Sequence, residues 1–101
     1  MKIRRALAEA APDAYLPGLA TSLYISALLQ AQDDRLQDAS VVAQEAISSY
    51  RVLAATEPEA FLANLRDALK LALEIIDQLD RSEERESVRR ELKAVERRLT
   101  S

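Results

Sequence analysis

Residues 7–23 read LAEAAPDAYLPGLATSL, and residues 53–69 read LAATEPEAFLANLRDAL, so the chain carries one pattern twice. With an offset of 46 residues, identical residues coincide at Leu7/Leu53, Ala8/Ala54, Pro12/Pro58, Ala14/Ala60, Leu16/Leu62, Leu19/Leu65 and Leu23/Leu69. Two further pairs match in chemical type, Asp13/Glu59 and Tyr15/Phe61. The coincidence of a proline and an aromatic ring is informative because the chain has only three Pro and four aromatic residues. A repeat of this period is typical of helical hairpins stacked side by side.

The composition favours an all-α fold in a single domain. The 101 residues contain one Gly and three Pro and are rich in Ala, Leu, Glu, Arg and Gln, which lose little on entering a helix. No stretch alternates apolar and polar residues in the manner of a strand. The apolar spacing and its breaks predict about five helices, over residues 1–11, 16–32, 35–55, 57–79 and 83–99.

The predicted breaks carry turn and capping residues. Pro12 to Leu16 is expected to be a connector, with Pro17 in the first turn of the helix that follows. Either Asp33 or Asp34 is expected to cap the next helix through its carboxylate. The segment from Thr56 to Glu59 reads Thr-Glu-Pro-Glu, which has the spacing of a capping box before the helix over residues 57–79.

Two of the predicted helices have features that bear on packing. In the helix over residues 35–55, small side chains would let a neighbouring helix approach closely, at Ala39, Ala43 and Ala46. In the helix over residues 83–99, the large apolar residues form one narrow seam, Val88, Leu92, Val95 and Leu99. Such a helix either covers the end of a helical stack or pairs with a second copy of the chain. A self-association seam is therefore kept as an alternative.

Charge and residue content argue against several classes of protein. The net charge is −3, with seven Lys and Arg against twelve Asp and Glu in residues 1–80 and seven against five in residues 81–101. The basic residues of the last helix alternate with Glu, so we expect no nucleic-acid binding. Without Cys and His, the chain lacks disulfides and the strong transition-metal ligands. No apolar run approaches the roughly 20 residues of a membrane span, and the N-terminus lacks a signal-peptide core, so a cytoplasmic location is expected.

The sequence predicts no enzyme. Acidic residues cluster at two predicted helix starts, Asp33, Asp34 and Asp38 at one and Glu83, Glu84 and Glu86 at the other. Acidic residues are common at such positions because they interact favourably with the helix dipole. The chain has no Gly-rich phosphate loop, no Ser with a His to activate it and no calcium-loop spacing. We therefore expect no catalytic residues, no metal site and no cofactor.

The residues around the repeat resemble the tetratricopeptide repeat family, in the longer-period form of kinesin-light-chain-like and bacterial arrays. The resemblance is carried by Pro17-x-Leu19-Ala20-x-x-Leu23, by Ala39 and Ala46, and by Tyr50-Arg51-x-Leu53-Ala54 with Pro58-x-Ala60-Phe61-Leu62. It covers most of residues 1–80. The chain departs from the family pattern at Ala27, Gln30, Asp34 and Arg85, where the family usually has Gly, a large aromatic, Gly and a small residue. The resemblance implies a short right-handed α-solenoid, of which this chain is a terminal or partial piece.

The resemblance also implies where a partner would bind, because the first helix of each hairpin lines a concave groove in such arrays. The groove positions here are Thr21, Tyr24, Leu28 and Gln32 in one helix and Asp67, Lys70, Glu74 and Gln78 in the other. An amphipathic or extended peptide with an apolar anchor and a basic flank would fit them. The expected function is a protein-interaction scaffold. Two alternatives stay open: a homodimerisation module of a larger regulatory protein, and simple burial of Tyr24 and Leu28 in the core.

Overall fold

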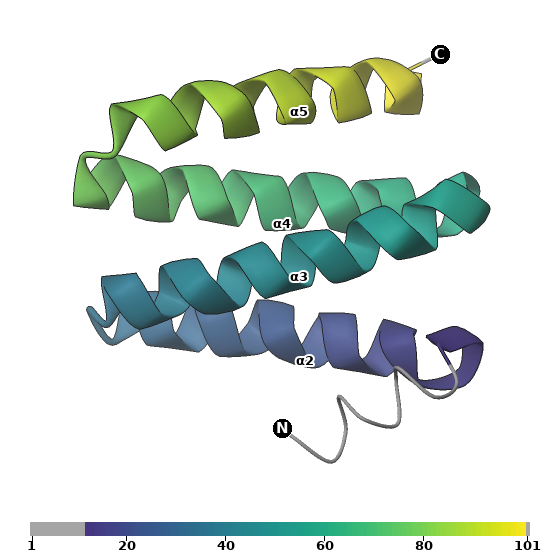
Figure 1. The fold of residues 1–101 in the computed structure, drawn as a ribbon, viewed down its shortest axis with the longest axis horizontal. Coiled ribbons are helices and arrows are strands. Elements are labelled where there is room, and N and C mark those ends of the chain that lie inside the picture. The colour runs from purple at the N-terminus through teal and green to yellow at the C-terminus, as the bar shows by residue number, and fades with distance from the viewer. Residues whose placement is uncertain (1–11, 101) are drawn as a thin grey trace.

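The computed structural model describes residues 12–100, and each element of secondary structure in that range is an α-helix. The helices are α2 (Pro12–Gln32), α3 (Leu36–Thr56), α4 (Pro58–Leu79) and α5 (Ser82–Thr100) (Figure 1). The predicted all-α class is confirmed, and the four helices lie close to the predicted ranges. The remaining predicted helix, over residues 1–11, lies outside the described residues.

The start of α2 differs from the prediction. The segment from Pro12 to Leu16 was expected to connect two helices, but it belongs to α2 and places Pro17 inside the helix. Proline at this position has no N–H to donate to the carbonyl of Asp13. The helix tolerates this loss near its end because α2 packs along α3. As a result, α2 and α4 begin at Pro12 and Pro58, the two prolines that the 46-residue offset aligns.

The predicted side-chain caps are wrong. Arg35 stands at the cap position of α3 and makes no side-chain capping hydrogen bond, so neither Asp33 nor Asp34 has that role. The cap position of α4 is Glu57, which also makes no such bond. Thr56 belongs to the end of α3, and its hydroxyl donates to a carbonyl of that helix at 3.2 Å.

Two of the turns between helices contain a residue in the left-handed backbone conformation. Asp34 and Asp80 are left-handed, with φ of 61° and 57°. Asp visits this region more readily than most residues because its short side chain can hydrogen-bond locally. The nitrogen of Arg35 donates to the carbonyl of Gln30 at 2.8 Å and closes the turn after α2. The breaks predicted at these aspartates are therefore confirmed, and left-handed backbone makes them, with Asp80 as the C-cap of α4.

The helices pack in the order of the chain. α3 lies against both α2 and α4, and α5 packs against α4 (Figure 1). α2 also touches α4, whereas no close backbone approach joins α2 to α5 within residues 12–100. The overall extents of 37 × 35 × 19 Å correspond to a slab about two helix diameters thick. The described helices form an open row with α2 and α5 at its ends.

The core follows the repeat. Leu19 and Leu23 of α2 are buried, as are their repeat partners Leu65 and Leu69 of α4. The small residues of α3 are buried as well, at Ala39, Ala43 and Ala46. They let α3 lie close to both neighbours, as their size suggested. Among the described helices, none combines the length and the apolarity that a membrane-spanning segment needs.

Candidate functional site

The predicted groove residues lie on α2 and α4, the two helices that touch beside α3. All eight are exposed or half-buried: Thr21, Tyr24, Leu28 and Gln32 on α2, and Asp67, Lys70, Glu74 and Gln78 on α4. Steps of three and four residues put each set along one side of its helix. The surface made by these eight residues is named the α2–α4 face.

Tyr24 is the aromatic residue of this face. Its side chain packs partly against the hydrophobic core and is otherwise exposed. Partial burial raises the pKa of the Tyr24 hydroxyl above its ordinary value of 10.0, and the negative charges of Asp67 and Glu74 raise it further, with a smaller effect of Tyr50. Both carboxylates of α4 therefore lie within electrostatic reach of the ring on α2.

Polar contacts hold the surroundings of Tyr24 in place. The hydroxyls of Thr21 and Tyr50 lie 3.4 Å apart, so a hydrogen bond joins α2 to the buried ring of α3. The Nε atom of Arg66 donates to the Asp67 carboxylate at 3.2 Å. The Asp67 charge is thus partly compensated by its own neighbour.

Leu28 completes the apolar part of the face. Like Tyr24, it is half-buried and packs against the core while part of its side chain reaches solvent. Both side chains therefore pack partly against the core, and their assignment to a groove stays a prediction. The accessible parts of the two side chains make a small apolar surface on α2.

Tyr24→Phe is expected to make the fold less sensitive to alkaline pH. Because the pKa of Tyr24 is raised in the folded protein, the unfolded chain loses this proton first as the pH rises above about 10. The contribution of Tyr24 is fully present below that pH and is lost as the pH passes the raised pKa. Urea unfolding of both proteins from neutral to strongly alkaline pH measures the effect. Parallel losses in the two proteins would contradict it.

A second charged surface lies between α3 and α5, and the sequence analysis missed it. Arg51 of α3 donates two hydrogen bonds to the Glu91 carboxylate of α5, one of them from Nε at 2.6 Å. These bonds raise the pKa of the Arg51 guanidinium above its ordinary value. Arg81 also reaches the Ser40 hydroxyl, at 3.5 Å. These pairs are 40 and 41 residues apart, so no local pattern could indicate them. They tie α3 to α5.

The predicted self-association seam is mostly covered by the chain itself. Val88, Leu92 and Val95 are buried in the core, and Leu99 at the end of α5 is 37% exposed. The seam therefore lets α5 cover the end of the row, the first of the two roles that its spacing allowed. A dimer through this seam would require α5 to leave α4.

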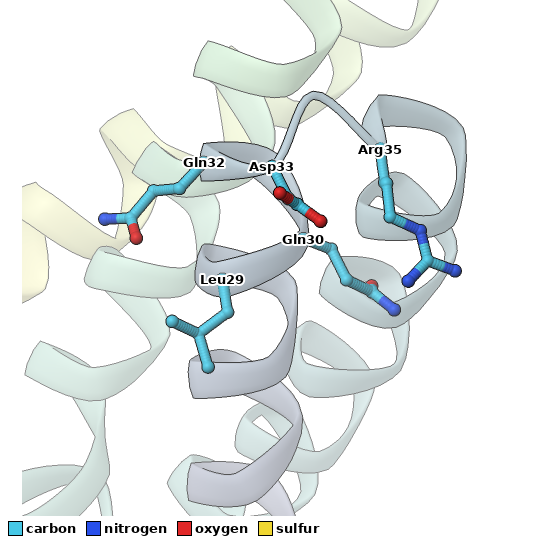
Figure 2. A pocket seen from close by; sticks show the side chains of 5 residues that line it. All are labelled: Leu29, Gln30, Gln32, Asp33 and Arg35. Atoms are coloured by element: carbon cyan, nitrogen blue, oxygen red, sulfur yellow. The ribbon is translucent and has the colours of Figure 1, made fainter.

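A shallow hollow lies where α2 turns into α3 (Figure 2). It is lined by Leu29, Gln30, Gln32, Asp33 and Arg35. The side chain of Leu29 projects from α2 away from Gln30 and Arg35 (Figure 2). Gln32, predicted for the groove, lies at this hollow and about two helical turns from Tyr24. The chemistry of the α2–α4 face is therefore concentrated around Tyr24.

No protein-family model, curated protein or solved structure matches this chain. The α2–α4 face and the contacts around it are the basis for a functional proposal.

Proposed function

We propose that this protein is an interaction module that binds a peptide segment of another protein on the α2–α4 face. The helical row would be a short tetratricopeptide-like solenoid in which α2 and α4 are the first helices of successive hairpins. The repeat supports this, because α2 and α4 start at aligned prolines and bury aligned leucines. The observation that carries the proposal is the half-buried Tyr24 of α2, which packs against the core and experiences the negative charges of Asp67 and Glu74 on α4.

The chemistry of the face favours a peptide with an apolar anchor beside a basic residue. Tyr24 and Leu28 present partly desolvated apolar surface, which an aliphatic or aromatic side chain would cover. The negative potential that opposes ionisation of Tyr24 also attracts Lys or Arg. A cationic group that reaches the Tyr24 ring would also gain a cation–π contact. Lys70, which lies between Asp67 and Glu74 in the sequence, would repel a basic residue of the peptide. The basic residue is therefore favoured only where it lies near Tyr24.

Peptides selected from a random library for binding to the 101-residue chain test this proposal. We expect the selected peptides to be enriched in Lys or Arg next to an apolar residue. With isotope-labelled protein, NMR shift changes on peptide binding should concentrate at Thr21, Tyr24, Leu28, Asp67 and Glu74. Shift changes confined to the surface between α3 and α5 would contradict the assigned face.

Charge-neutral variants separate recognition from folding. Asp67→Asn with Glu74→Gln keeps the shape of the face and removes two negative charges, so peptide affinity at low salt should fall by roughly 10-fold. The matched control, Glu86→Gln with Glu96→Gln, removes two charges from exposed positions of α5. An equal loss of affinity in the control would show that net charge, not the α2–α4 face, controls binding.

A further inference from the structure

α2 and α4 hold equivalent places in the 46-residue repeat but have different neighbours. Among residues 12–100, α4 packs against α3 before it in the chain and α5 after it, whereas α2 has α3 after it and no helix before it. A comparison of paired residues in α2 and α4 therefore identifies the surface of α4 that its preceding helix covers.

The paired residues fall into two groups. Leu19 and Leu23 of α2 are buried, and so are their aligned partners on α4, Leu65 and Leu69. In the second half, Leu71 is 5% exposed whereas its partner Ile25 is 48% exposed. Likewise, Ile75 is 0% exposed whereas its partner Leu29 is 59% exposed. Ile25 and Leu29 are thus largely exposed at repeat positions that are buried on α4.

Ile25 and Leu29 belong to a continuous line along α2. Gly18, Ser22, Ile25 and Leu29 follow one another in steps of four, three and four residues, so they share one side of the helix. A Cβ atom added at Gly18 would meet nothing within 4 Å, so this end of the line is open too. These four residues are named the α2 stripe. It lies on a different side of α2 from the half-buried Tyr24.

We propose that the α2 stripe docks against the same stripe of a second copy of the chain. The two α2 helices would run antiparallel about a two-fold axis, with Ile25 of each copy against Leu29 of the other. The charge distribution favours this occupant, because residues 14–32 contain no charged side chain. Two such helices can approach without opposing or burying charges. This dimer goes beyond peptide binding and does not depend on it.

The opposite end of the row does not offer a matching surface. Val88, Leu92 and Val95 of α5 are buried, and the exposed side chains of this helix include Arg89, Lys93 and Glu96. Packing those charges against Ile25 and Leu29 would desolvate them without partners, so a head-to-tail stack of copies is unfavourable. A single helix pair buries less than the roughly 1,200 Å² of a standard interface, so we expect a dissociation constant on the order of 1–100 µM.

Two double substitutions at similarly exposed apolar residues test the dimer. Ile25→Glu with Leu29→Glu brings charges together across the proposed two-fold axis. The matched control is Val41→Glu with Val52→Glu on α3, where the two valines are 62% and 56% exposed. Analytical ultracentrifugation of the full chain, at protein concentrations below and above the expected dissociation constant, should show dimers for the wild type and the control. The Ile25 and Leu29 variant should dimerise at least about 100-fold more weakly.

Three outcomes would overturn the proposal. One is a wild-type chain that stays monomeric over the whole concentration range. Another is an equal loss of the dimer in both double variants, since added negative charge would then weaken dimerisation at any surface position. The third is unfolding of the dilute monomer by Ile25→Glu with Leu29→Glu, measured by circular dichroism. That result would mean that the stripe is covered within one chain.

Discussion

Ile75→Ala is expected to lower the free energy of unfolding by about 3 kcal/mol. Ile75 is fully buried in the main core cluster, where α4 has neighbours on both sides. Truncation loses buried apolar area and leaves a cavity that rigid helices fill only partly. Small domains have a total stability of about 5–15 kcal/mol, so one substitution would remove a large share of it. Urea unfolding followed by circular dichroism measures the loss.

Leu29→Ala is the matched control, because Leu29 is the repeat partner of Ile75. It removes a side chain of similar size that is 59% exposed, and Ala is at least as favourable as Leu in a helix. We expect a change within about 0.5 kcal/mol when both variants are measured below the dissociation constant of the dimer. Equal losses at the two positions would show that Leu29 is covered within the chain. A negligible loss for Ile75→Ala would contradict its place in the core.

The helix ranges could be predicted from the sequence because strong local signals separate the helices. Asp33-Asp34, Pro58 and Asp80 interrupt segments rich in Ala and Leu, and each interruption coincides with a helix end. The errors occur where local signals compete with packing. Pro12 to Leu16 was predicted to be a connector, yet α2 begins at Pro12 and has Pro17 in its interior. Packing along α3 outweighs the hydrogen bond that Pro17 removes.

The site could be predicted only along single helices. A spacing of three and four residues showed which side chains share one side of α2 or α4. The influence of the Asp67 charge on Tyr24 depends on how the helices pack, as does the pairing of Arg51 with Glu91. The α2 stripe was missed for a different reason. Ile25 and its partner Leu71 are both large and aliphatic, and their different burial depends on neighbouring helices that no single residue specifies.

Ala43→Leu is the second substitution with a large expected effect, because it adds volume where α3 meets its neighbours. Ala43 is buried in the main core cluster, and α3 packs against both α2 and α4. The helix propensities of Ala and Leu are similar, so helix formation in α3 itself should change little. The added carbons must displace packed side chains or push a helix away. We expect a loss of about 1–3 kcal/mol in the free energy of unfolding.

Gln44→Leu provides the control for this substitution, because Gln44 is the next residue of α3 and is exposed. Its free energy of unfolding should stay within about 0.5 kcal/mol of the wild type. Comparable losses for the two variants would point to an effect of leucine on α3 itself. If Ala43→Leu were as stable as the wild type, there would be free space beside α3. That result would contradict close packing of α3 with α2 and α4. The two results together therefore test whether small side chains on α3 set the spacing of the row, on which the α2–α4 face depends.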